Sequence, residues 1–425
     1  MMLHRRTFQK VFGLSALSLA TGQSPAIAQS GQKKKIAFLG TAIFKHSHAQ
    51  HFLDRLCEGY TWRGGWQEPR LEVAGTYIAQ FPKRSDLGRK RLRRYQLKQF
   101  ESVTDALTLG GDQLAVDGVF LIGEHGDYPT NEKGQTLYPR YEWFKEIVKV
   151  FERSGRSVPV FNDKHLSTQW SECREMVADA RRLGFPLHAG SSLPVTVRMP
   201  DIDMPTDADL RESVCIAFGG VDSYDFHALE TAQCMSERRR GGEVGIKNVL
   251  ALRDAKVWDH LSQPAQATTR KLVVAALCRS HNLPSVGGYP TAKVSFDWAR
   301  QALPEIVGYF IEHVDGFRTA IFLTGIRDFN YAGWIGDEGK ILTCQMYLPM
   351  PGHGSSTADF FNPLIRHAEE MILTGKQPYP VERTLLTSGM VIAGVESLHT
   401  GQPVPTPDMN IQYQIPPDAS YYWRG

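Results

Sequence analysis

The feature that most constrains the fold is the regular alternation of short apolar runs with longer amphipathic stretches over residues 33–195. Runs that are apolar at every position predict strands buried on both faces, as in a parallel sheet. Stretches of helical length separate these runs, which is the spacing of βαβ units, so we expect a doubly wound α/β domain. The expected strands are 36–39, 71–78, 118–122, 158–161 and 186–189, and the expected helices are 46–59, 102–109, 141–154 and 167–183.

The pattern changes after about residue 195, which predicts a second domain over residues 196–375. Its expected strands are 214–218, 293–296, 317–323 and 341–347, and its expected helices are 224–237 and 361–374. Strands with little helix between them favour an open, mainly antiparallel sheet in an α+β domain. We expect such a sheet to pair chains into a homo-oligomer through its open face. The proline-rich segment 376–425 is expected to wrap the surface.

Residues 1–28 have the three parts of an export signal. Arg5 and Arg6 form a twin-arginine pattern, the apolar stretch 11–20 follows, and Ala26-Ile27-Ala28 is a small-x-small cleavage site. No apolar stretch in the sequence is long enough to span a bilayer. We therefore expect the Tat pathway to export the folded chain to the periplasm or another extracytoplasmic space.

The charge of the mature chain argues against nucleic acid as a partner. Without Arg5, Arg6 and Lys10, the 48 basic side chains fall to the number of the 45 acidic ones, so the mature protein is about neutral. The eight basic residues within 83–98 are expected to form a solvated surface. Six widely spaced cysteines without a CxxC pair exclude a zinc ribbon and a disulfide scaffold.

Polar and ionisable side chains follow several expected strands at their carboxyl ends. In doubly wound sheets, ligands bind outside these ends, so the clusters predict one binding site. The residues are Thr41, Lys45, His46, Ser47 and His48 after the first strand, Glu124, His125 and Asp127 after the third, Asn162, Asp163, Lys164 and His165 after the fourth, and Gly190, Ser191 and Ser192 after the fifth.

Lys164 and His227 are the candidates for acid–base chemistry. Lys164 follows an apolar strand, where its ammonium could hold a substrate hydroxyl. His227 and Glu230 lie three residues apart at the start of an expected helix, so we expect the carboxylate to orient the imidazole. A surface lysine and a core histidine are the alternatives for these positions.

These motifs resemble the Gfo/Idh/MocA oxidoreductases. The resemblance rests on Val-Pro-Val-Phe-x-x-Lys ending at Lys164, on Phe-Pro-Leu-x-Ala-Gly-Ser ending at Ser191, and on His227-x-x-Glu230. Asp163 stands for the family's usual Glu and His165 for its usual Pro. The resemblance implies a Rossmann-like domain over 33–195, a substrate and oligomerisation domain, and an NAD(P)-dependent enzyme acting on a sugar or polyol-like hydroxyl compound. It implies catalytic roles for Lys164, His227, Glu230 and Asp163.

The dinucleotide fingerprint is altered. A G-x-G-x-x-G turn needs glycines for the turn and for pyrophosphate approach, but here Ala42 and Lys45 replace two of them and only Gly40 remains. No acid ends the second strand, and Arg84 could face the 2′-phosphate of NADP. Either NAD or NADP remains a candidate. The expected cofactor-binding residues are Gly40, Thr41, Ala42, Lys45, Arg84, Glu124 and His125.

Two alternatives stay open. A divalent metal could bind imidazole and carboxylate ligands from two strand ends, with His46, His48, Glu124, His125 and Asp127 as candidates. The same fold could then serve a metal-dependent or cofactor-free carbohydrate lyase or hydrolase, or a non-catalytic carbohydrate-binding protein. A serine hydrolase is excluded because the sequence has no G-x-S-x-G elbow.

Overall fold

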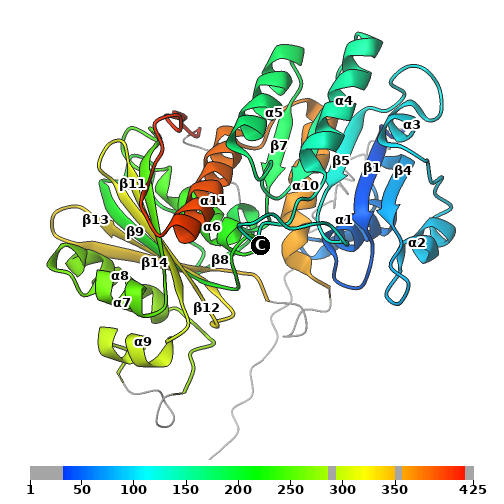
Figure 1. Ribbon diagram of the computed structural model, residues 1–425. Helices are drawn as coiled ribbons and strands as arrows, with labels where there is room; N and C mark the ends of the chain where they lie inside the picture. The colour runs from blue at the N-terminus through cyan, green and yellow to red at the C-terminus, as the bar shows by residue number, and fades with distance from the viewer. Residues whose placement is uncertain (1–31, 286–292, 350–356, 417–425) are drawn as a thin grey trace, which may run out of the picture. The chain divides into compact units, whose positions relative to one another are not determined.

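The structure is a computed structural model that describes residues 32–285, 293–349 and 357–416. The expected export signal, residues 1–28, lies outside these residues. From Lys33 onward the chain forms one compact unit. Within it, one parallel and one mainly antiparallel sheet carry most of the strands (Figure 1).

The first sheet has five parallel strands in the order β4–β1–β5–β6–β7. The strands are β1 (Lys35–Ala42), β4 (Glu72–Gln80), β5 (Gly118–Ile122), β6 (Val160–Asp163) and β7 (Leu187–Gly190). The helices around them are α1 (His48–Glu58), α2 (Gly88–Arg94), α3 (Val103–Thr108), α4 (Arg140–Ser154) and α5 (Trp170–Leu183). A short hairpin, β2 (Tyr60–Trp62) and β3 (Gly65–Gln67), precedes β4. The expected doubly wound sheet is confirmed.

An isolated parallel bridge between Thr76 and Gln99 stands where one more strand would extend the sheet beyond β4. If this remnant is counted as the third strand in chain order, the strands from edge to edge are the remnant, β4, β1, β5, β6 and β7, which is the order 3-2-1-4-5-6. That is the strand order of dinucleotide-binding sheets, whose ligand crevice opens where the order reverses. Here the reversal lies between β1 and β5, so loops 43–47 and 123–139 border the crevice.

The alternating side chains of the strands fill two separate cores, as apolar runs in a parallel sheet require. Phe38 and Phe120 pack with Phe52 of α1 on one face. Leu39 and Leu121 pack on the other face with the apolar sides of α3, α4 and α5. Burial on both faces fixes the register of the strands and therefore the positions of the loops at their carboxyl ends.

The second sheet has eight strands in the order β15–β10–β11–β12–β9–β13–β14–β8, and only the β9–β12 pair is parallel. The strands are β8 (Arg198–Met199), β9 (Leu210–Phe218), β10 (Ile246–Arg253), β11 (Val307–His313), β12 (Arg318–Thr324), β13 (Phe329–Ile335), β14 (Lys340–Met346) and β15 (Val404–Pro405). The expected mainly antiparallel sheet is confirmed, but the strand expected at 293–296 is wrong. Ser295 caps helix α9 (Phe296–Ala302) there by accepting a hydrogen bond from the Trp298 N–H.

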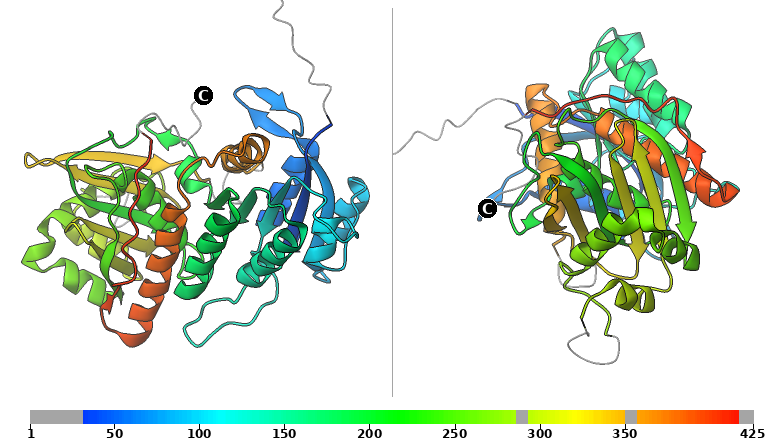
Figure 2. Two further views of the ribbon diagram at one scale, coloured as in Figure 1. Left: turned by 90° about the horizontal axis from the view of Figure 1, so that it is seen from above. Right: turned by 90° about the vertical axis from the view of Figure 1, so that its left-hand side faces the viewer.

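Helices cover both faces of the second sheet (Figure 2). On one face lie α6 (Asp225–Ser236) and α11 (Glu382–Thr400), and on the other α7 (Ala255–Leu261), α8 (Ala267–Leu277) and α9. Leu272 of α8 and Trp298 of α9 pack against Val214 and Phe322 of the central strands. The face through which we expected two chains to pair is therefore occupied over these strands by the chain's own helices.

The C-terminal part departs from the expected organisation. Helix α10 (Asn362–Thr374) packs beside α1 and the β2–β3 hairpin, although the sequence placed it in the second domain. The expectation that residues 376–425 wrap the surface is wrong for α11, which is largely buried. The absence of proline within α11 was the signal that could have identified this helix.

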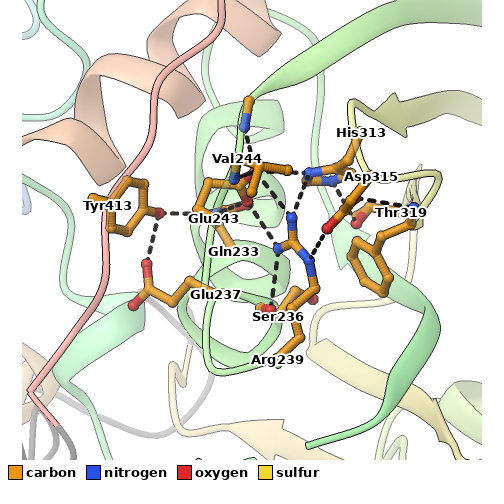
Figure 3. Close-up of polar contacts among 12 residues, drawn as sticks. Gln233, Ser236, Glu237, Arg239, Glu243, Val244, His313, Asp315, Thr319 and Tyr413 are labelled. Carbon is orange, nitrogen blue, oxygen red and sulfur yellow. Dashed lines mark hydrogen bonds and ion pairs between the residues drawn. The ribbon is translucent and has the colours of Figure 1, made fainter. Parts of the chain in front are cut away.

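A buried polar network ties the end of the described chain to α6, as Figure 3 shows, and Arg383 links it to α11. Glu243 accepts hydrogen bonds from Gln233 Nε2 at 2.7 Å and Arg239 Nη1 at 3.0 Å. Tyr413 donates to Glu237 at 2.7 Å, and the fully buried Arg383 donates from Nε to the same carboxylate at 2.9 Å. Because these charges are buried, they depend on one another for their stability.

We predict that Arg383→Met destabilises the folded protein by about 3–5 kcal/mol, because it leaves the Glu237 carboxylate buried without its cation. Urea unfolding monitored by circular dichroism measures this change. The matched control is Arg300→Gln, which breaks a solvent-exposed pair with Asp259 and should cost about 1 kcal/mol or less. Equal effects of the two substitutions would contradict this account of the network.

Candidate functional site

A pocket of about 240 Å³ lies where the loops after β1, β5 and β6 meet the start of α6. Five histidines line it (His46, His48, His51, His125 and His227), together with Glu124, Lys164, Tyr138 and Tyr224. The sequence had placed most of these residues at one rim, and the structure brings them together.

The backbone at the end of β6 places Lys164 in an uncommon conformation. Its φ is +70°, in the left-handed region that a lysine rarely adopts. Asn162 Nδ2 lies within 3.4 Å of the carbonyl oxygens of Asp163, Lys164 and His165, and the Lys164 N–H donates to Gly190 of β7. His46 and His125, which line the same pocket, also have positive φ. Such outliers gather at functional sites, where the surrounding structure holds the strain.

The Lys164 ammonium bridges the two domains inside the pocket. Its Nζ lies 2.6 Å from His227 Nε2 on α6 and 3.3 Å from Glu124 Oε1 in the loop after β5. Only 4% of Lys164 is exposed. Burial alone would raise the pKa of the Glu124 carboxyl, but the charge of Lys164 and neighbouring cationic groups outweigh it and hold the pKa well below its usual value.

Arg140 holds Glu124 and the end of β6 in place from behind. The guanidinium donates to the carbonyl of Gly123 at 3.0 Å, lies 2.9 Å from His165 Nε2 and reaches Glu124 Oε2 at 3.6 Å. It is 2% exposed. Burial, followed by the charge of Arg140, lowers the pKa of His165 well below its usual value, so the neutral ring accepts the hydrogen bond. Arg140 was not predicted from the sequence, where its only signal was its place at the start of a helix after a long polar loop.

His48 and Asp163 form a second pair at the pocket. His48 Nδ1 lies 2.7 Å from Asp163 Oδ2, and the carboxylate is fully buried. The His48 ring packs edge-on against Phe361, with centroids 5.0 Å apart. Asp163 therefore contacts His48, and the direct catalytic role suggested by the sequence stays a prediction.

His227 is neutral at physiological pH. Burial and then the charge of Lys164 lower its pKa well below the usual value. A neutral ring accepts the Lys164 N–H at Nε2, so its own proton resides on Nδ1, for which the described residues offer no hydrogen-bond partner. Burial also lowers the pKa of His125 to about 4, although the neighbouring Glu124 carboxylate favours its protonated form.

Glu230 does not orient His227, and this expectation is wrong. Its Oε2 accepts hydrogen bonds from the Ser191 N–H at 2.7 Å and the Ser191 hydroxyl at 2.6 Å. Gly190 makes this contact possible, because a Cβ at its φ of +129° would lie 2.7 Å from Glu230 Oε1. Residues at i and i+3 share a helix face, but these donors at the end of β7 draw the carboxylate away from the imidazole.

The first turn differs from a glycine-rich dinucleotide turn. Strand β1 continues through Gly40 and Thr41 to the fully buried Ala42, and the Thr41 hydroxyl donates to the Glu124 carbonyl. Helix α1 begins only at His48. Its N-terminal amides are partly used, because Ser47 Oγ accepts from the N–H groups of Phe44 and Gln50, and Gln50 Oε1 accepts from that of His46. Lys45 is exposed and lines a neighbouring pocket instead.

A larger cavity of about 710 Å³ lies beyond the ends of β4 and β5. Lys83, Ser85 and Asp127 line it, whereas Arg84 is exposed and is not among its lining residues. His125 and Tyr138 line both this cavity and the histidine-rich pocket. The two cavities therefore adjoin each other along the crevice of the first sheet.

The metal alternative finds no geometric support in the described part of the chain. Within residues 32–285, 293–349 and 357–416, no group of three or more His, Cys, Asp or Glu side chains is placed to hold a metal ion. His46, His48, Glu124 and His125 line one pocket, but Asp127 lies at the exposed outer rim.

The fold matches known dehydrogenase structures over most of the chain. Three similar structures are GenD2 from gentamicin A biosynthesis in complex with NAD, a probable dehydrogenase from Thermotoga maritima, and a putative myo-inositol dehydrogenase from Sinorhizobium meliloti. They are 14%, 10% and 10% identical, with TM-scores of 0.52, 0.52 and 0.51. Each covers 88% of this chain, which in turn covers 97%, 99% and 99% of theirs. The expected two-domain fold is confirmed. Neither a family model nor a curated protein matches the sequence.

Burial raises the pKa of Glu230 from 4.5 to about 7. Between these values the folded protein binds a proton that the unfolded chain has released, so stability is present below pH 4.5 and is lost as the pH rises through 7. Glutamine stays neutral at every pH. We therefore predict that the free energy of unfolding of Glu230→Gln rises by about 3 kcal/mol relative to that of the wild type between pH 4.5 and pH 8. Urea unfolding across this range tests the effect, and parallel stability curves would contradict it.

Proposed function

We propose that the protein is an oxidoreductase that transfers a hydride between NAD(P) and a hydroxyl group of a sugar or polyol. The observation that carries this proposal is the buried contact of Lys164 with His227, 2.6 Å apart, at the carboxyl ends of a dinucleotide-type sheet. A similar fold binds NAD in GenD2, and another similar chain is described as a putative myo-inositol dehydrogenase. The fold itself does not specify an activity, so the site residues carry the proposal.

Lys164 and His227 divide the acid–base work. The neutral Nε2 of His227 can accept the proton that an alcohol loses on oxidation. The Lys164 ammonium holds the substrate oxygen and stabilises the negative charge that develops on it. Glu124 pairs with Lys164 and holds it in place, while Arg140 fixes Glu124. Because His227 belongs to α6 and Lys164 directly follows β6, a complete site requires both domains.

The two adjoining cavities of the crevice could hold the two ends of a dinucleotide. The cavity at the ends of β4 and β5 is large and carries Lys83, and it adjoins the catalytic pocket at His125 and Tyr138. When bound there, NAD(P) would supply the hydride acceptor. Lys83 and Ser85, rather than Arg84, would contact the adenosine end, and His48 would lie along the middle of the cofactor.

A second candidate function keeps the acid–base groups but uses no nucleotide. The capped start of α1 favours it, since Ser47 and Gln50 occupy amides that a pyrophosphate would otherwise use. The His48–Asp163 pair adds a further acid–base group to the pocket. A carbohydrate lyase or hydrolase would need these groups, and nucleotide binding separates the two candidates.

We propose that this activity lies outside the cytoplasm, because Arg5 and Arg6 form a twin-arginine export pattern. None of the helices in the described ranges is both long and apolar enough to cross a membrane. Export in the folded state would let a cofactor be bound in the cytoplasm beforehand. The segment therefore supports a tightly held nucleotide.

We predict that Lys164→Met and His227→Gln each lower kcat for NAD(P)-linked oxidation by about 10²–10⁴-fold, because the first removes the charge that stabilises the substrate oxygen and the second removes the proton acceptor. The assay follows NAD(P)H absorbance with a panel of sugars and cyclitols. Lys271→Met and His260→Gln, both outside the pocket, serve as matched controls and should keep full activity. Loss of activity in the controls, or full activity in the pocket variants, would refute these roles.

A further inference from the structure

A second pocket, of about 210 Å³, adjoins the catalytic pocket at the end of the second sheet. Leu348 lines both pockets. An aromatic path also links them, because the Arg327 guanidinium lies 5.9 Å from the centroid of Phe218, whose ring meets that of Tyr224 edge-on at 5.2 Å. Tyr224 lines the catalytic pocket and Arg327 lines the second one. A molecule longer than one sugar ring could therefore occupy both.

The second pocket contains a buried acceptor with no hydrogen bond. Gln345 of β14 lines the pocket and is only 3% exposed, yet its Oε1 has no partner among the described residues. Asn330, directly opposite on β13, is fully buried, and neither polar atom of its side chain has a partner there. Directly opposed residues of an antiparallel pair point to the same face. Unsatisfied buried amides cost stability, and native proteins keep them where another molecule completes the bonds.

The remaining walls of the pocket suit an uncharged, hydroxyl-bearing ring. The Asp328 carboxylate already accepts hydrogen bonds from the Ser280 hydroxyl, the His281 N–H and Asn282 Nδ2. Met199, directly opposite Gln345 in the β8–β14 pair, supplies an apolar surface beside these polar groups. A pyranose has the same division, with an apolar C–H face and hydroxyls around its edge.

We propose that the Gln345 pocket binds a second sugar ring, so that the substrate is a glycoside with its reacting ring in the catalytic pocket. The assignment of the reacting ring rests on the proposed function. Gln345 Oε1 accepts a hydrogen bond from a hydroxyl of the second ring, and Met199 contacts the ring's apolar face.

Calorimetric titration of the full mature protein tests this subsite. The probes are matched pairs, each a methyl hexopyranoside and a disaccharide that extends it by one hexose. We expect at least one disaccharide to bind 10-fold or more tightly than its methyl glycoside. Gln345→Leu should abolish this advantage, leave the methyl glycoside affinity within twofold, and keep or raise Tm because it removes an unsatisfied buried group. Arg279→Gln, whose guanidinium bonds Thr343 outside the pocket, is the control and should keep the advantage.

Two results would overturn the subsite. One is a panel in which no disaccharide binds more tightly than its methyl glycoside. The other is an advantage that persists unchanged in Gln345→Leu. The proposed oxidation can fail independently of the subsite. Tighter disaccharide binding without any NAD(P) reduction would refute the oxidoreductase and keep the subsite. NAD(P) reduction with equal affinities for the disaccharide and its methyl glycoside would keep the oxidoreductase and refute the subsite.

Discussion

The contact of the Lys164 ammonium with Glu124 and His227 is the interaction on which the rest of the site depends. An ammonium buried in a pocket must be neutralised, and Glu124 supplies the charge while Arg140 holds Glu124. Burial, together with the charge of this ammonium, keeps the His227 ring neutral and able to accept a proton. Because His227 comes from the second domain, the packing of α6 and α11 between the two sheets also serves the chemistry.

The first sheet could be predicted in detail because its strands are apolar runs buried on both faces. The second sheet was harder: β10, β11 and β13 carry polar residues such as Asn248, Glu312 and Asn330, which interrupt the alternation that identifies a strand. Lys164 and His227 were identified from their places at a strand end and a helix start. Arg140, the His48–Asp163 pair and the bond of Glu230 to Ser191 depend on tertiary contacts across loops, which sequence spacing does not reveal.

The altered first turn shows how a dinucleotide-type sheet can change its ligand contacts and keep its frame. Strand β1 runs two residues past Gly40, and α1 starts later with its own side-chain caps. The loss of glycines therefore accompanies a longer strand and a self-capped helix. Contacts from His48, Lys83 and Ser85 would have to replace the amides that a glycine-rich turn offers to a pyrophosphate.

The most direct test of the central claim is the nucleotide content of the mature protein, purified from cells with an active Tat pathway, denatured and analysed by mass spectrometry. Our account predicts NAD or NADP, either retained in about equimolar amount or bound after incubation with excess nucleotide. A protein with native circular dichroism that neither retains nor binds NAD(P) would contradict the account and favour nucleotide-free acid–base chemistry at Lys164 and His227.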